Sequence, residues 1–100
     1  MKSPLKDKSY SFALRIINLY KYLTSEKKEF VMSKQILRSG TAIGALICES
    51  EFGQSKADFS SKMSIALKEA NETVYWLCLL NDSGYIDAKM FNSLSKDLQE

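Results

Sequence analysis

Two glutamates, Glu69 and Glu72, stand three residues apart in a stretch of helical spacing, with Lys62 and Lys68 nearby. Carboxylates at this spacing share one face of a helix and can act as general acid and base or bind a metal ion. Carboxylate-bridged metal bundles also use Glu-x-x-His pairs, and this chain has no histidine. We therefore predict no catalytic site, no metal site and no cofactor, and we do not expect an enzyme.

Other sequence motifs of catalysis are missing as well. The chain has no glycine-rich phosphate loop, no GxGxxG and no paired CxxC. Its two cysteines, Cys48 and Cys78, each lie within an apolar pattern of helical spacing. This placement predicts buried free thiols rather than a disulfide framework.

The stretch from Gln35 to Gly53 organises the rest of the chain, because it combines helical spacing with many small residues. Gly40 and Gly44 are four residues apart and so share a face. Two glycines inside a helix cost roughly 1 kcal/mol each relative to alanine. Close approach of a neighbouring backbone, which a missing Cβ permits, is the usual compensation. We therefore predict that another helix presses against both glycines.

Arg38 and Glu49 bracket this small-residue patch about three turns apart, so they cannot pair with each other. Either each is a solvated charge at the edge of a bundle, or each makes a charged hydrogen bond that fixes the register of the helices. In the second case, one of Glu69 and Glu72 is the natural partner of Arg38. In the first case, the two glutamates are simply exposed.

The length of 100 residues suits one domain, which we assign to residues 1–100, with a single small core. The 45% hydrophobic content is typical of a globular chain, and one proline and four glycines leave little turn material for a β-rich fold. The apolar run 41–48 is far shorter than the ~20 residues that a membrane span needs. No signal peptide is recognisable, so we expect a cytoplasmic protein without membrane contact.

Charge is unevenly distributed along the sequence, although the net charge is only +2. Residues 1–40 hold nine basic and three acidic residues, a net +6, whereas residues 41–100 hold five and nine, a net −4. The basic part can attract phosphates or an acidic face on another copy of the chain. The candidates for phosphate contact are Lys8, Arg15, Lys27, Lys28 and Lys34, and the alternative for Lys27 and Lys28 is simple solvation.

Apolar spacing predicts four helices, over about 7–24, 31–52, 56–82 and 87–100. Residues 1–6 are predicted to be an extended lead-in, because the Ser-Pro dipeptide is biased away from helix, and Asp7 or Ser9 can cap the first helix. Ser55 and Asp58 have the spacing of a capping box at the start of the third helix. Four helices with short loops predict an all-α, antiparallel up-down four-helix bundle.

The first helix carries an apolar stripe over about half of its circumference, against ~100° for a simple surface helix. Its seam repeats at intervals of four, three and four through Phe12, Ile16, Leu19 and Leu23, and Ala13, Ile17, Tyr20 and Tyr10 widen it. Only a few residues are predicted to face outward, Tyr22 among them. The third predicted helix alternates intervals of four and three in the same way, through Phe59, Met63, Ala66, Ala70, Thr73, Leu77 and Leu80. Such wide burial indicates several neighbours or a partner chain, and in so short a chain we favour the partner chain. The fourth helix is shorter than the others and leaves part of the core uncovered, which favours burial against another copy, or a shortened chain.

Several blocks of this sequence together resemble the small four-helix-bundle proteins encoded in intervening sequences of bacterial 23S ribosomal RNA genes. The resemblance covers nearly the whole chain, and the paired blocks around Arg38 and Glu69 are its most specific part. Its landmarks are Ser9-Tyr10, Phe12-Ala13, Gln35-Ile36-Leu37-Arg38-Ser39, Ile43-Gly44, Glu49, Phe59, Lys62, Ile65-Ala66-Leu67-Lys68-Glu69-Ala70, Glu72-Thr73, Tyr75-Trp76-Leu77 and Gly84-Tyr85-Ile86.

This resemblance implies a left-handed antiparallel four-helix bundle that assembles as a ring-like pentamer. Accessory proteins of diversity-generating retroelements look like the same fold, and there a basic pentameric barrel engages reverse transcriptase and RNA. Those proteins are strongly basic, whereas this chain is nearly neutral. Family members also usually have a longer fourth helix.

We therefore expect a non-enzymatic, self-assembling bundle whose first partner is itself, as a homo-oligomer and by resemblance a pentamer, and whose further partner is RNA. The alternative is a scaffold or adaptor that binds another protein and has no nucleic-acid role. Salt-sensitive binding to structured RNA would favour the first function, because phosphate contacts weaken steeply with salt. Capture of a protein partner that survives nuclease and high salt would favour the second.

Overall fold

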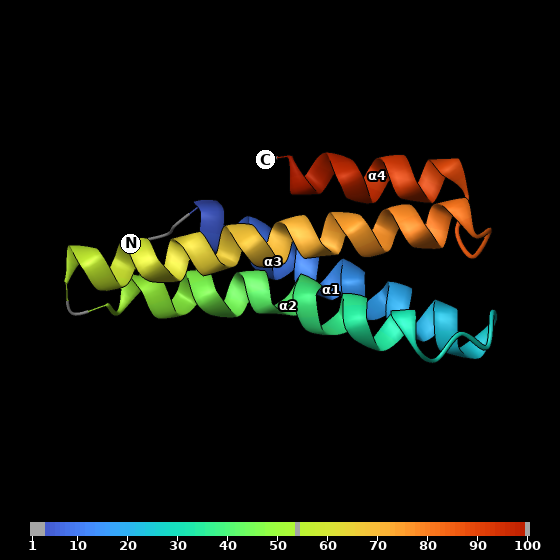
Figure 1. Cartoon of the computed structure of the whole chain (residues 1–100), viewed down its shortest axis with the longest axis horizontal. Coiled ribbons are helices and arrows are strands. Elements are labelled where there is room, and N and C mark those ends of the chain that lie inside the picture. Colours follow the sequence, from blue (N-terminus) through green and yellow to red (C-terminus); the bar gives the residue numbers. More distant parts are fainter. Residues whose placement is uncertain (1–3, 54, 100) are drawn as a thin grey trace.

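The computed structural model describes residues 4–53 and 55–99, which form four helices and an elongated body of 43 × 22 × 20 Å. The helices are α1 (Pro4–Ser25), α2 (Met32–Glu51), α3 (Lys56–Asp82) and α4 (Ala88–Leu98). Each helix runs opposite to the one before it, and α4 lies along only one half of the bundle (Figure 1). The predicted all-α four-helix fold is therefore confirmed, while the left-handed sense of the bundle stays a prediction.

Three of the four predicted helix ranges lie close to the observed ones. The third, 56–82, coincides with α3, whose start is capped by the Ser55 hydroxyl accepting from the Asp58 backbone N–H at 3.1 Å. The second, 31–52, is one residue too long at each end. The fourth, 87–100, narrows to Ala88–Leu98 because Asp87 is its N-cap, and residue 100 lies outside the described part of the chain.

The predicted start of the first helix is wrong, because α1 begins at Pro4 rather than at residue 7. Proline lacks an N–H and has a fixed φ, and both properties suit the first turn of a helix, so Pro4 starts the helix instead of preceding it. Neither Asp7 nor Ser9 is the cap: Asp7 lies in the first turn, and the buried Ser9 hydroxyl donates to the Lys6 carbonyl at 3.0 Å. Residues 1–3 lie outside the described part.

The core follows the predicted helix seams. All four seam residues of α1 are buried, and they meet buried residues of the other three helices. The buried members of this core are Phe12, Ile16, Leu19, Leu23, Ile36, Leu77, Leu80, Ile86 and Leu94. This core is continuous along α1, α2 and α3, so these three helices form the stable frame on which the surface residues are positioned.

Tyr22 is placed differently from its predicted outward position, because its ring is half-buried against the core. The reason is α4, whose Met90 and Leu94 line the same groove as Tyr22 and so cover this side of α1. The ammonium group of Lys27 lies 5.9 Å from the centre of the Tyr22 ring, a cation–π distance.

The connection between α1 and α2 is held by Glu29, a buried acidic residue that the sequence pattern did not single out. Its carboxylate accepts backbone N–H bonds from Val31, Met32 and Ser33, at 3.1, 3.0 and 2.7 Å, and so caps the start of α2. Burial acts to raise the pKa of Glu29, but the three N–H donors outweigh it, and the pKa lies below its ordinary value of 4.5.

Candidate functional site

Arg38 joins α2 to α3 through both of the glutamates that sequence spacing singled out. One guanidinium nitrogen donates to the two carboxylate oxygens of Glu69, at 3.2 and 3.1 Å, and the other donates to Glu72. The indole N–H of Trp76 donates to the same Glu72 oxygen at 3.3 Å. Both carboxylates are therefore engaged in a charged network that spans two helices, which leaves them poorly suited to proton transfer.

A buried pair of hydroxyls lies beneath this network. The Thr73 hydroxyl donates to the Ser39 hydroxyl at 2.9 Å, and both residues are fully buried between α2 and α3. Because buried polar groups are costly without partners, this bond favours one register between the two helices. Near the end of α2, Glu49 forms an exposed ion pair with α3, in which it accepts from Lys62 at 3.3 Å.

The two glycines of α2 both face α1, but they differ in how closely that helix approaches. A Cβ on Gly40 would lie 2.8 Å from Cγ1 of Ile16, which is closer than real contacts allow. A Cβ on Gly44 would lie 3.4 Å from the carbonyl oxygen of Ser9, an ordinary contact. Of these two positions, only position 40 therefore requires glycine for the packing of α1 against α2 within one chain.

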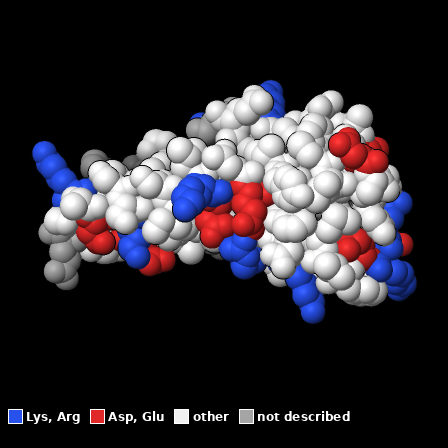
Figure 2. All heavy atoms as spheres, viewed as in Figure 1, with Lys and Arg blue, Asp and Glu red and all other residues white. Residues whose placement is uncertain are grey.

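The five candidate cations do not form one patch. Arg15 is tied to α4, where its guanidinium donates to Asp97 at 2.5 Å and to the Ser93 hydroxyl at 2.7 Å. The other four lie in two separate places: Lys8 lies toward the start of α1, and Lys27, Lys28 and Lys34 lie at or beside the α1–α2 connection. On the face drawn in Figure 2, basic and acidic side chains are interspersed rather than segregated.

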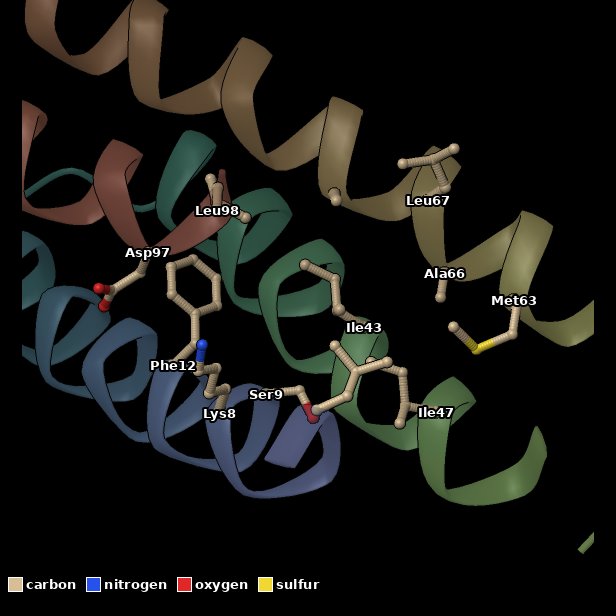
Figure 3. Close-up of a pocket in the computed structure, with 12 residues that line it drawn as sticks. Lys8, Ser9, Phe12, Ile43, Ile47, Met63, Ala66, Leu67, Asp97 and Leu98 are labelled. Carbon is tan, nitrogen blue, oxygen red and sulfur yellow. The ribbon is translucent and has the colours of Figure 1, made fainter. Parts of the chain in front are cut away.

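An apolar groove opens where α4 ends, and we call it the α4-end groove (Figure 3). It has a volume of about 190 Å³ and is walled by residues of all four helices, chiefly Leu5, Phe12, Ile47, Met63, Leu67 and Leu98. Lys8 and Asp97 stand at its polar edge. Leu67 is 64% exposed here, so a large apolar side chain of the groove faces solvent.

A second apolar surface lies on the opposite side of α1, and we call its three residues Tyr10, Leu14 and Ile17 the α1 ridge. Tyr10 is 67% exposed and Leu14 is 48% exposed, while Ile17 is half-buried. Exposed apolar patches of this kind on small proteins commonly mark interaction sites. The sequence pattern had placed Tyr10 and Ile17 on the widened stripe of the first helix, whereas Leu14 was not singled out.

Two residues that hold structural elements in place, Glu29 at the start of α2 and Asp97 on α4, escaped the sequence analysis. Glu29 gave a usable signal, because an acidic residue just before a helix is typical of a stabilised N-terminus. Asp97 gave none, since its partner Arg15 lies 82 residues away in sequence. Among the described residues, no cluster of three metal-ligating side chains occurs and no helix is long and apolar enough to cross a membrane.

Comparison with known proteins gives a family match and a structural match over nearly the whole chain. Residues 2–100 match the model of a family described as 23S rRNA-intervening sequence protein. A crystal structure of a protein with unknown function from the S23 ribosomal protein family of Bacteroides thetaiotaomicron is 61% identical, with a TM-score of 0.94. The match covers 95% of this chain and 88% of that one. No curated protein matches the chain.

Proposed function

The chain belongs to the 23S rRNA-intervening sequence protein family, and on that premise we propose that it is a non-enzymatic cytoplasmic protein that assembles with copies of itself and contacts RNA through cations at one end of the bundle. The assembly is a pentamer in this proposal, as the family resemblance implies. The RNA contact uses the phosphate backbone, because the exposed lysines at that end carry charge but no base-reading geometry.

The observation that carries self-assembly is the exposure of large apolar side chains on two helices. Tyr10 and Leu14 project from α1, and Leu67 projects from α3, and all three are large apolar side chains exposed to solvent. Removing such surface from water contributes about 25 cal/mol per Å². A second copy of the chain is the one apolar-faced partner that is always present at the concentration of the protein itself.

The lysines at the α1–α2 connection support the RNA contact. Lys27 and Lys28 are exposed in this connection, and Lys34 is exposed in the first turn of α2. In a ring of parallel copies these lysines recur once per copy on one rim. Such repetition raises the effective affinity for a long polyanion well beyond that of a single copy.

Sedimentation velocity at micromolar concentration tests the assembly. We expect the protein to sediment as an oligomer with several times the mass of one chain. We also expect this association to persist in high salt, because the contacts between copies are apolar. A stable monomer at micromolar concentration would contradict the proposal.

Filter binding to a structured RNA tests the nucleic-acid contact. Reversing the charge at both Lys27 and Lys28 should lower the affinity by roughly tenfold or more at low salt and flatten its salt dependence, because each phosphate contact contributes to the salt slope. The matched control reverses Lys89 and Lys96 on α4, which makes the same change in net charge elsewhere. Equal losses in both variants, or no binding at low salt, would contradict the RNA contact and leave self-assembly standing.

The second candidate function is a scaffold that binds another protein without nucleic acid. It is favoured by the engagement of Arg15 with Asp97, which removes one candidate cation from the proposed RNA surface. A partner retained after nuclease treatment and high-salt washing would support this function. The assembly proposed above is common to both candidates.

A further inference from the structure

The connection between α1 and α2 inverts the usual placement of polar and apolar side chains. Glu29 is buried, whereas the two residues that follow it, Phe30 and Val31, are 54% and 73% exposed. Exposed large apolar side chains and buried charges are the informative exceptions to hydrophobic burial. Positions where the local sequence contradicts the fold in this way are commonly functional. Phe30 therefore has a reason to be aromatic that the core of the bundle does not supply.

The connection is held firmly enough to present Phe30 in a fixed position. The Glu29 backbone N–H donates to the Leu23 carbonyl at 2.9 Å, and the Ser33 hydroxyl donates to the Glu29 carbonyl at 2.9 Å. Together with the three N–H bonds to the Glu29 carboxylate, they fix the backbone on both sides of the ring. Lys28 has a φ of 55°, which turns the chain just before it. A ring on so fixed a backbone loses little conformational freedom when a ligand covers it.

The charge around the exposed ring is predominantly positive. Lys27 and Lys28 precede the ring by three and two residues, Lys34 follows it by four, and all three lysines are exposed. The one exposed acid of segment 26–34 is Glu26, because the Glu29 carboxylate is buried against the start of α2. Within the part of the chain that the structure describes, no carboxylate forms an ion pair with these lysines. An anionic ligand therefore meets three available cations here.

A ligand that suits both an exposed aromatic ring and the surrounding cations carries flat rings and regularly spaced negative charges. Unpaired nucleotides have both, because their bases stack on aromatic side chains and their phosphates attract cations. A paired duplex presents its phosphates but keeps its bases stacked inside, out of reach of the ring. Four residues span at most about 14 Å of backbone, so the ring and the three lysines lie within the length of about four stacked nucleotides at ~3.4 Å each.

We propose that Phe30 is a stacking platform for an unpaired RNA base, with Lys27, Lys28 and Lys34 holding the flanking phosphates. This inference rests on the RNA contact proposed above and narrows its ligand to unpaired nucleotides, such as those in the loop of a hairpin. The start of α2 is not the phosphate site, because the Glu29 carboxylate occupies its N–H groups. The lysines therefore supply the charge, whereas Phe30 supplies a preference for single strands that tolerates any base.

Phe30→Leu tests the stacking face, because leucine keeps an apolar side chain but has no ring. Its affinity for a short oligouridylate, measured by fluorescence anisotropy, should be roughly tenfold lower than that of the unmodified protein at every salt concentration, with an unchanged salt slope. Its affinity for a blunt RNA duplex of the same length should not change. Val31→Ala is the matched control at the neighbouring, more exposed position and should leave both affinities unchanged. Circular dichroism shows that each variant keeps its fold.

Phe30→Trp gives a direct signal of stacking. The unmodified chain has one tryptophan, Trp76, which is half-buried and donates to Glu72. A base that stacks on an indole quenches its fluorescence, so the oligouridylate should quench the Phe30→Trp variant much more than the unmodified protein. This variant should also bind the oligouridylate at least as tightly as the unmodified protein, because it keeps a flat ring at position 30.

The possible outcomes separate this inference from the RNA contact on which it rests. Unchanged binding by Phe30→Leu, or bound Phe30→Trp that is not quenched, would overturn the stacking and leave the phosphate contact standing. Equal losses for the duplex and the oligouridylate, or a changed sedimentation of Phe30→Leu, would assign the ring to a protein contact and would also overturn the stacking. An unmodified protein that binds neither RNA at low salt would instead remove the RNA contact itself.

Discussion

Gly40 lies so close to Ile16 that a Cβ built on the glycine would stand 2.8 Å from Cγ1 of the isoleucine. Ile16 is fully buried, and the atoms that would clash belong to the base of its side chain rather than to a flexible end. This contact sets the distance between α1 and α2. These two helices flank the α1–α2 connection and form two walls of the α4-end groove. The contact leads to the first prediction.

Gly40→Ala should destabilise the protein, whereas Gly44→Ala should not. Overpacking at position 40 costs up to about 3 kcal/mol, which outweighs the ~1 kcal/mol that alanine contributes to helix formation. At position 44 the new Cβ would make an ordinary 3.4 Å contact, so the gain in helix propensity remains. Urea denaturation of the two variants measures the difference, and equal stabilities would contradict the assigned role of Gly40.

The second prediction concerns pH and follows from the lowered pKa of Glu29. A carboxyl with a lowered pKa in the folded state stabilises the protein above its unfolded pKa, and this contribution is lost as the pH falls through the folded pKa. The contribution of Glu29 to the free energy of unfolding should therefore be constant near neutral pH and should decline below about pH 4.5. Urea denaturation between pH 7 and pH 3 measures the decline.

The variant Glu29→Gln distinguishes the contribution of Glu29 to the pH dependence of stability from the contributions of the other carboxylates. The amide keeps one oxygen for the backbone N–H groups but loses the charge at the start of α2, so at neutral pH we expect a loss of about 1 kcal/mol. The variant should also lose less stability on acidification than the unmodified protein. An identical pH profile in both proteins would show that Glu29 does not titrate between the folded and unfolded states as inferred.

Regular spacing made the fold predictable. The 3.5-residue repeat in helices 1 and 3 identified buried residues such as Leu19 and Leu77 and led to an all-α bundle. It could not decide the start of α1, because Pro4 is compatible both with a lead-in and with a first helical turn. It also could not predict that α4 covers Tyr22, since that contact depends on tertiary arrangement.

The site was less predictable than the fold. Sequence spacing offered Glu69 or Glu72 as a partner for Arg38, and the forked guanidinium reaches both. The engagement of Arg15 by Asp97 was beyond sequence reasoning, because a surface ion pair between distant helices leaves no periodic signal. For the same reason the α4-end groove was expected only as an uncovered part of the core, without its position or lining.

The third prediction concerns the Arg38 network, in which Glu69 is more buried than the half-exposed guanidinium. A double-mutant cycle on Arg38→Ala and Glu69→Ala should give a coupling free energy of about 0.5–1 kcal/mol, because one guanidinium nitrogen contacts both Glu69 oxygens but the pair is open to solvent on one side. Urea unfolding of the unmodified protein, the two single variants and the double variant gives the four free energies that the cycle needs. A coupling of zero would reduce the network to an uncoupled surface contact.

The fourth prediction concerns α4, which has 11 residues and is too short to be stable as an isolated helix. Its position depends on apolar contacts through Leu94 and on the bonds from Arg15 to Asp97 and Ser93. Arg15→Ala removes these bonds without touching the seam of α1. We expect the amides of α4 to exchange with deuterium roughly tenfold faster, because local opening of a weakly held element becomes easier, while the amides of α2 and α3 change little.

Lys89→Ala is the matched control for this measurement, because it removes a cation from α4 itself at an exposed position. It should leave the exchange of α4 unchanged. If Arg15→Ala and Lys89→Ala accelerate exchange equally, net charge rather than the bond to Asp97 holds the helix. If neither does, the apolar contacts of Leu94 suffice to hold α4, and the edge of the α4-end groove does not depend on Arg15.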